Sequence, residues 1–322
     1  MSKIIDANEF SRVTREELDN FTKSKIEEFQ FEYQEVSDDE QKFMIEFIKG
    51  EIGKNLPASG QDRRADWENG WLENRKLLED NNGISSLIPR YFGKFPLVRW
   101  DGRIVRTISK NFEYNMLVAL ELQVFGRLLK NSSKIYELGC GTGHNLLRAR
   151  AVNLNAKITG LDWTKSSQEI LKRLNDLNLL DCNARNFDFF NPDTSLDLAG
   201  ASVYSVAALE QIGSSHGDLI NFLIEKSPEI CIHLEPIVEL MDKKNELDKL
   251  CADYCAKRNY LFEFLTKLRQ LRDEGKIEIL EEKRNSIGSL FIEGYSLVTW
   301  RPVKGRNNEK SFSNRRVWDG RT

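Results

Sequence analysis

The chain has 322 residues, of which 40% are hydrophobic and 30% are charged, the balance of an ordinary globular protein with a sizeable core. The formal net charge of −3 gives no general positive field, so we do not expect nucleic acid as the partner. No apolar run reaches the roughly 20 residues that a membrane-spanning helix needs. Residues 1–10 lack the features of a signal peptide, so we expect a cytoplasmic protein.

The five cysteines are scattered and odd in number, which argues against a complete disulfide framework. Cys251 and Cys255 stand four apart in a stretch that the pattern predicts to be helical. No second Cys or His pair lies at a useful spacing, so we expect core cysteines and no metal site.

Residues 1–104 are predicted to be a helical and loop-rich N-terminal segment. Thr14 and Glu17 have the spacing of a capping box, which predicts a helix start at Thr14, and Ser37 and Glu40 repeat the device. Residues 53–66 form a looser stretch.

Two tryptophans follow in "DWENGWLENRKLLED", where Trp67 and Trp71 would lie one above the other on a helix. Residues 81–100 read as loop or short extended pieces because they contain two prolines and two glycines. Residues 109–131 are predicted to be an amphipathic helix.

From residue 134 onward, strand patterns alternate with helix patterns, which predicts crossover units and a mostly parallel sheet. The short connection between the last two strands makes that pair antiparallel. A single long helix is expected at about 246–274. The seven expected strands are 134–139, 157–163, 182–190, 196–209, 229–237, 276–286 and 295–303.

These patterns divide the chain into three parts. The fold class is α/β, a Rossmann-like seven-stranded sheet with an antiparallel last strand and an N-terminal helical segment. We expect the helical segment at 1–104, the sheet domain at 105–303, and a basic tail at 304–322 that is either flexible or packed through Trp318.

A glycine-rich turn follows the first strand of the sheet in "KIYELGCGTGHN". Gly139, Gly141 and Gly143 follow Glu137 with one residue between each pair. Glycines at such a turn let a ligand or a neighbouring group approach the backbone closely. A dinucleotide fingerprint would place its third glycine where His144 stands, which disfavours a nicotinamide enzyme.

The segment "ELGCGTG" resembles the glycine motif of the class I S-adenosylmethionine-dependent methyltransferases, and the resemblance covers about 134–303. It implies S-adenosyl-L-methionine as cofactor, with Asp162 on the ribose hydroxyls, and Asp188 and Phe189 on the adenine. The cofactor-binding set that it implies is Glu137, Gly139, Gly141, Gly143, Asp162, Trp163, Asp188, Phe189 and Tyr204.

Several of these residues have a structural alternative. Asp162 can cap the following helix, and Asp188 can form a turn before Asn191. Glu137 can accept hydrogen bonds from the turn itself. Tyr114 and Asn115 either reach the amino-acid end of the cofactor or belong to the core.

The catalytic base is less defined, because Ala207 stands where many small-molecule members of that family carry His. Candidate catalytic residues are Glu210 after the fourth strand, and His233 and Glu235 on one face of the fifth. A buried structural role is the alternative for the last two. His216, in an exposed-looking loop, is a weaker candidate, and Gln211 can only hydrogen-bond.

The resemblance implies an enzyme that methylates oxygen or nitrogen of a small polar metabolite or sugar. The alternatives are a protein or RNA acceptor, and a binding protein without turnover. We expect the N-terminal segment to form a lid or substrate-binding part over the acceptor, or else to be held on the sheet domain by its aromatic residues. Those residues are Trp67, Trp71, Tyr91, Phe92 and Trp100.

Overall fold

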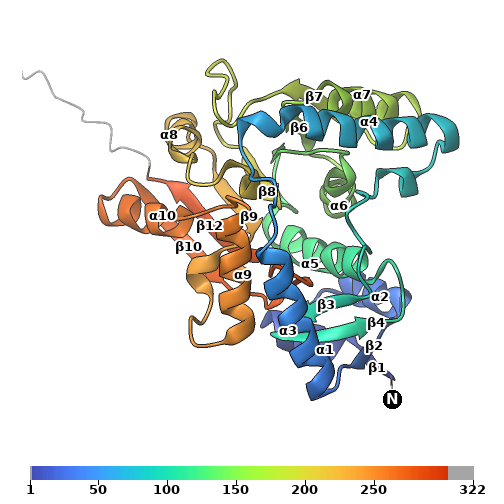
Figure 1. Cartoon of the computed structure of the whole chain (residues 1–322). Coiled ribbons are helices and arrows are strands. Elements are labelled where there is room, and N and C mark those ends of the chain that lie inside the picture. The colour runs from blue at the N-terminus through green and yellow to red at the C-terminus, as the bar shows by residue number, and fades with distance from the viewer. Residues whose placement is uncertain (1, 304–322) are drawn as a thin grey trace, which may run out of the picture.

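The computed structural model describes residues 2–303, and its largest element is a seven-stranded sheet in the order β10-β12-β9-β8-β5-β6-β7 (Figure 1). The strands are β5 Lys134–Leu138, β6 Lys157–Asp162, β7 Asn183–Asn186, β8 Ser202–Val206, β9 Ile230–Glu235, β10 Ile277–Lys283 and β12 Ser296–Pro302. Strands β5 to β9 pair in parallel, and β12 runs antiparallel to both β9 and β10. The predicted Rossmann-like sheet with an antiparallel last strand is confirmed.

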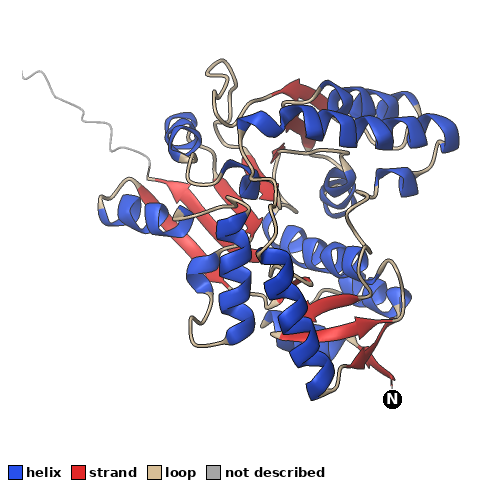
Figure 2. Cartoon of the chain, viewed as in Figure 1, coloured by secondary structure: helices blue, strands red, loops and turns tan. Residues whose placement is uncertain are grey.

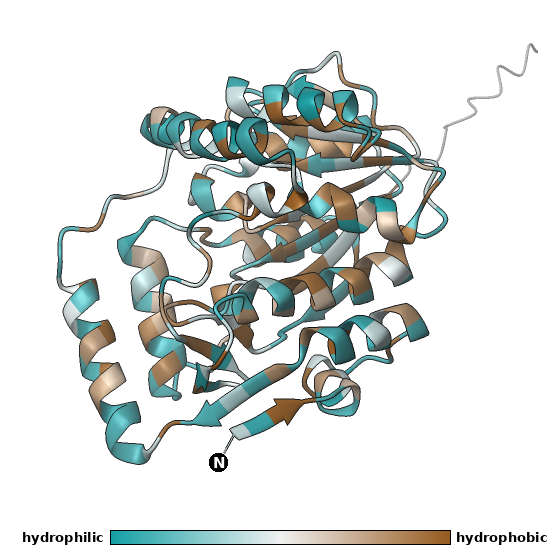
Figure 3. Ribbon diagram, turned by 90° about the vertical axis from the view of Figure 1, so that its right-hand side faces the viewer, coloured by the Kyte–Doolittle hydropathy of each residue, from teal (hydrophilic) through white to brown (hydrophobic). Residues whose placement is uncertain are grey.

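Helices cover both faces of this sheet (Figure 2). Apolar residues of one group of these helices join the same core cluster, and those of a second group join another. Figure 3 shows the apolar residues gathered where helices meet the sheet. The first group is α5 Phe112–Leu128, α6 His144–Val152 and α7 Lys165–Asp176, and the second is α8 Gly217–Lys226 and α10 Phe264–Asp273.

The N-terminal segment contains the expected helices, a further helix at Ala7–Thr14, and several strands, of which only the one at Leu97–Trp100 lies where we expected short extended pieces, in 81–100. Its helices are α1 Ala7–Thr14, α2 Asn20–Phe29, α3 Asp38–Ile52 and α4 Arg64–Asn81. A second, antiparallel sheet has the order β1-β2-β4-β3-β11. Its strands are β1 Ser2–Ile5, β2 Phe31–Glu35, β3 Leu97–Trp100, β4 Arg103–Thr107 and β11 Ile287–Ser289.

The smaller sheet joins the two parts of the chain that we expected to be separate. Strand β4 spans the expected boundary at 104/105, and β11, from the C-terminal region, pairs with β3. The first core cluster likewise contains residues from both parts, such as Phe10 and Leu146. The N-terminal segment is therefore built into the body of the protein.

Helix starts in this segment follow their capping side chains. Ser37 accepts a hydrogen bond from the Glu40 amide, so the expected helix start at Ser37 is confirmed, whereas the Glu40 carboxylate accepts from Arg106 and does not complete a capping box. The helix start expected at Thr14 is wrong, because Thr14 ends α1 and its hydroxyl donates to the Phe10 carbonyl. The next helix is capped instead by Asp19, which accepts from the Thr22 amide at 2.7 Å.

The long helix expected at 246–274 is interrupted. It consists of α9 Glu246–Lys257 and α10, and the chain between them passes through left-handed residues Asn259 and Glu263. Asn259 tolerates this conformation, and its side-chain amide donates to the Ser59 carbonyl at 2.9 Å. The break turns the residues near 260 toward the interior.

Over residues 2–303, no helix is long and apolar enough to cross a membrane. The expectations for the basic tail at 304–322, including Trp318, lie outside the described residues.

One buried carboxyl group in α5 lies without a hydrogen-bond partner. Glu121 is fully buried, and neither of its oxygens has a hydrogen-bond partner within residues 2–303. Arg148 is its ion-pair partner there, with 3.6 Å between Glu121 Oε2 and Arg148 Nε. Burial raises the pKa of Glu121 to about 8, against the smaller opposing effect of Arg148. Ionising this group in the folded state is therefore costly.

This carboxyl makes stability pH-dependent in a predictable direction. A raised folded-state pKa adds stability below the unfolded pKa, and that stability is lost as the pH rises through about 8. Glu121→Gln should remove up to roughly 2 kcal/mol of the stability loss between about pH 6 and pH 8. Urea unfolding at both pH values measures it, with exposed Glu225→Gln as the control. An unchanged pH dependence in Glu121→Gln would contradict this account.

Candidate functional site

The turn after β5 has all three of its motif glycines in the left-handed region. Gly139, Gly141 and Gly143 have φ of +70°, +53° and +77°. A Cβ on Gly139 would lie 2.6 Å from the Ala208 Cβ, and one on Gly143 would lie 2.4 Å from a Leu171 methyl. Both the backbone conformation and the close packing therefore require glycine here.

Asp162, the last residue of β6, holds this turn in place. Its Oδ2 accepts from the Gly141 amide at 2.9 Å, and its Oδ1 accepts from the Thr164 amide and hydroxyl. Burial raises the pKa of Asp162 against these hydrogen bonds. The residue also lines the cavity described next, so the carboxylate supports the turn and still faces a possible ligand.

A cavity of about 410 Å³ opens beside the turn, at the carboxyl ends of β5 and β8. The strand order reverses between these two strands, which is the usual ligand position in open α/β sheets. Its walls come from three regions of the chain: the N-terminal segment, the strand ends of the main sheet, and residues 254–295.

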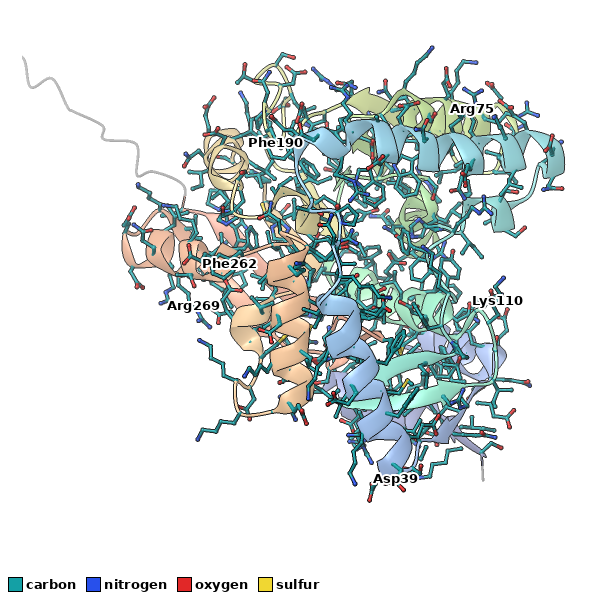
Figure 4. All side chains as sticks on the ribbon, in the orientation of Figure 1. Asp39, Arg75, Lys110, Phe190, Phe262 and Arg269 are labelled. Carbon is teal, nitrogen blue, oxygen red and sulfur yellow. The ribbon has the colours of Figure 1, made fainter. Side chains whose placement is uncertain are left out.

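Aromatic side chains form the wall next to β6 and β7. Trp163, Phe189 and Phe190 all line the cavity, and the rings of Trp163 and Phe190 lie 6.0 Å apart. Phe190 is labelled in Figure 4. Asp188 is not among the lining residues, and its Oδ1 accepts from the Phe190 amide at 2.9 Å, which is the turn-forming alternative.

Glu137 and Tyr204 do not line the cavity, which corrects their expected place on a cofactor. Both side chains are fully buried. The Tyr204 hydroxyl donates to Glu137 Oε2 at 3.0 Å, and Asn145 Nδ2 donates to Oε1 at 2.8 Å. Burial raises the pKa of Glu137 well above its usual value. Glu137 and Tyr204 thus stabilise the turn from the protein interior, because their hydrogen bonds link β5 to β8 and, through Asn145, to α6.

Helix α4 lies beside α7, and its tryptophans reach the glycine turn (Figure 1). The ring of Trp71 would lie 2.9 Å from a Cβ on Gly141, and the rings of Trp67 and Trp71 are 5.3 Å apart. Glu68 accepts from the Lys165 and Ser166 amides at 2.7 and 3.0 Å, at the start of α7. Helix α4 is thus fixed over the part of the cavity next to the glycine turn and α7.

The other three expected lid residues behave differently from one another. Tyr91 lines the cavity. Trp100 packs on Phe10 inside the smaller sheet's core, with ring centroids 5.7 Å apart, and Phe92 packs on Tyr114. Tyr114 itself hydrogen-bonds Arg148, and neither it nor Asn115 lines the cavity.

Glu210 lies in the short turn η3 Leu209–Ile212 and lines the cavity. Gln211 Nε2 donates to its Oε1 at 2.8 Å, and its Oε2 has no partner. Burial, and then the charge of Glu235, raises the pKa of Glu210 to about 8. Ala207 also lines the cavity and has a strained φ of +46°.

Glu235 and His233 do not reach the cavity, which corrects their expected catalytic role. Glu235 is fully buried and accepts from the amides of Ala208, Leu209 and Glu210 at 3.0 to 3.3 Å. It caps η3, and burial raises its pKa to about 7.

The two histidine candidates are also structural. His233 Nδ1 hydrogen-bonds Ser205 at 2.9 Å, and its Nε2 accepts from Trp300 Nε1 at 3.0 Å. Burial lowers the pKa of His233 to about 3, so its ring is neutral. His216 is buried rather than exposed, and its Nε2 hydrogen-bonds the Phe262 carbonyl.

The sequence patterns missed several cavity residues. Glu113 begins α5, Tyr254 lies in α9, Tyr260 follows the helix break, and Tyr295 precedes β12. Glu113 was visible only as one more acid in an amphipathic helix. The position of Tyr260 depends on a helix break that no Gly or Pro marks.

Unpartnered polar atoms gather around this cavity. Five cavity-lining residues each have one buried polar atom without a hydrogen-bond partner in the described residues. These atoms are Arg63 Nη1, Trp67 Nε1, Asn145 Oδ1, Glu210 Oε2 and Arg258 Nε. Because buried polar groups are normally paired, their clustering indicates a place that a polar ligand or water completes.

Cys251 and Cys255 are both buried and reduced. Within residues 2–303, no group of three or more His, Cys, Asp or Glu side chains is placed to hold a metal ion.

No family model and no curated protein matches the chain. Among solved structures, it is similar to an N-methyltransferase, NodS, from Bradyrhizobium japonicum, with 11% identity, 72% of this chain and 100% of that chain covered, and a TM-score of 0.45. It is also similar to an O-methyltransferase family protein from Burkholderia thailandensis, with 13% identity, 74% of this chain and 73% of that chain covered, and a TM-score of 0.44. A third similar structure is an O-methyltransferase from neocarzinostatin biosynthesis, in complex with S-adenosylmethionine and a naphthoic acid. The identity is 13%, 74% of this chain and 70% of that chain are covered, and the TM-score is 0.41. At these identities the likeness concerns the fold alone.

The packing around the glycine turn predicts a stability difference between two glycines. Gly143→Ala and Gly200→Ala impose the same left-handed strain, since φ is +77° and +69°. Only Gly143 has a neighbour in the way, because nothing lies within 4 Å of a Cβ on Gly200. Gly200→Ala should cost about 1 kcal/mol of unfolding free energy, and Gly143→Ala should cost about 1–3 kcal/mol more. Equal losses in urea unfolding would show that the turn is not close-packed.

Proposed function

We propose that this protein is a methyltransferase that uses S-adenosyl-L-methionine to methylate oxygen or nitrogen of a small molecule. The observation that carries this proposal is the glycine turn at the switch point of the sheet, opening onto a cavity with an acid and aromatic rings beside it. Asp162, Trp163 and Phe189 lie where the second and third strands end.

The residues present fit this cofactor. Trp163 and Phe189 offer apolar ring faces for an adenine, and Asp162 offers acceptor oxygens for ribose hydroxyls. Asn145 Oδ1 and Trp67 Nε1 need a donor and an acceptor, and the amino-acid end of the cofactor carries both. At Gly139 and Gly141 the glycines make room for Ala208 and for the ring of Trp71, which pack directly on the turn beside the cavity.

When bound, the cofactor supplies a methyl group that its sulfonium makes electrophilic. The protein's own contribution is then to align the acceptor, exclude water and hold a proton. Helix α4 covers the cofactor side, and Glu210 provides a carboxyl group with an unpartnered oxygen.

A small acceptor fits this cavity better than a protein or RNA chain. Walls from three regions of the chain surround it, and Trp71 packs against the turn from outside. The unpartnered Glu210 favours an enzyme over a binding protein without turnover, because such a group destabilises the fold unless it is used.

Calorimetric titration with S-adenosylmethionine and its demethylated product tests the cofactor. Both should bind the wild-type protein, and Phe189→Ala should weaken binding about tenfold or more, because a ring face against the adenine is lost. Phe262→Ala is the matched control, since Phe262 is 50% exposed, is labelled in Figure 4, and does not line the cavity. Absence of binding in a folded wild-type sample would contradict the proposal.

A further inference from the structure

Two carboxyl groups of the cavity share one space with two tyrosines. Glu113 and Glu210 come from α5 and η3, and both line the cavity together with Tyr91 and Tyr295. Burial, and then the charges of both glutamates, raises the pKa of Tyr295, and the same groups raise the pKa of Tyr91, although 41% of the Tyr91 surface is exposed to solvent. Each tyrosine therefore lies within electrostatic reach of both carboxyl groups.

Neither carboxyl group has a cationic partner in the described part of the chain. No ion pair within 4.0 Å involves Glu113 or Glu210. Of the cavity's cations, Arg63 is bridged to Asp66. Arg258 lies over the ring of Tyr260 at 5.2 Å, and its charge partly offsets the rise in the pKa of Glu210 that burial and Glu235 cause. Lys94 is exposed.

Carboxyl groups without an ion pair are unusual in the wall of a cavity, and among the described residues Glu113 has only a hydrogen bond from the Gly93 amide to stabilise its charge. Burial raises the pKa of Glu113 to about 7, and that of Glu210 to about 8. A ligand that brings a positive charge and N–H donors would satisfy both groups, whereas a ligand carboxylate would add a third acid. A neutral hydroxyl would satisfy one oxygen and leave the second carboxyl unpaired.

The aromatic walls favour the same kind of ligand. Tyr91, Tyr254, Tyr260 and Tyr295 line this end of the cavity. The faces of tyrosine rings attract cations by roughly 0.5–2 kcal/mol each when the cation is within about 6 Å. They also accommodate the carbon skeleton of an organic amine.

We infer that the acceptor is a small organic amine, which enters as an ammonium ion and is held by Glu113, Glu210 and the tyrosine rings. This inference rests on the proposed function and names its substrate class. Glu113 acts as a binding residue through its charge.

Glu210 acts as the catalytic base. Its carboxylate accepts one proton from the ammonium nitrogen, and the N–H bonding pair stays on nitrogen as the free lone pair. The residue is suited to this because it follows Ala208, whose methyl packs against Gly139 of the cofactor turn. A carboxyl that titrates near neutral pH can accept this proton under working conditions.

The test is binding of matched triplets: compounds with one carbon skeleton that carry an ammonium, a hydroxyl or a carboxylate. A set of aromatic and aliphatic triplets is measured by ligand-observed NMR at millimolar concentration, on protein saturated with the demethylated cofactor product. Ammonium members should bind preferentially across the set, by about tenfold or more. Preference for hydroxyl or carboxylate members, or no preference and no binding, would overturn the inference.

Variants locate the effect. Glu113→Gln and Glu210→Gln should each lower the ammonium preference several-fold, while Glu225→Gln, at an exposed glutamate, should leave it unchanged. The affinity for the demethylated product should be the same in all of them. If the wild-type protein does not bind the demethylated product, the proposed function is contradicted. If it binds the product but shows no preference for ammonium compounds, only the inference of an amine acceptor is wrong.

Discussion

The backbone of residues 139–143 is held against the end of β6, and the site depends on this one constraint. The amides of Gly139 and Cys140 donate to the Leu161 carbonyl, and that of Gly141 donates to Asp162. Left-handed φ values at three glycines let the chain turn there and start α6 at once. As a result, the ends of β5, β6 and β8 meet around one cavity.

The buried carboxyl groups around the turns after β5 and β8 have two distinct roles, and their hydrogen bonds distinguish the two. Glu137 and Glu235 are fully buried, and both oxygens of each accept hydrogen bonds from protein donors. These two groups therefore fix the turns after β5 and β8. Glu210 lines the cavity, and its Oε1 accepts a hydrogen bond from Gln211, whereas its Oε2 has no hydrogen-bond partner among the described residues. Chemistry is expected from the group that the fold leaves incomplete.

Local signals in the sequence predicted the part of the fold that depends on neighbouring residues. The glycine spacing, the alternation of strands and helices, and the Ser37 cap each act over a few residues, and the structure follows them. The smaller sheet was missed because its strands have only three to five residues, and β11 lies far from its partner in the chain.

The site itself was predictable only in part. Alternation correctly places His233 and Glu235 on one face of β9, but the strand is buried, so alternation does not tell which face meets the cavity. Tyr260 reaches the cavity because α9 ends before the left-handed Asn259, a break that Ser59 from the N-terminal segment stabilises. Such contacts between distant segments have no local signature.

A crystal structure of the protein grown with the demethylated cofactor product is the most direct test of the central claim. The account predicts density for the product between the 139–143 turn and the ring of Phe189, with its ribose near Asp162 and Trp71 over the turn. Product bound anywhere else, with this cavity empty or filled by side chains, would contradict it.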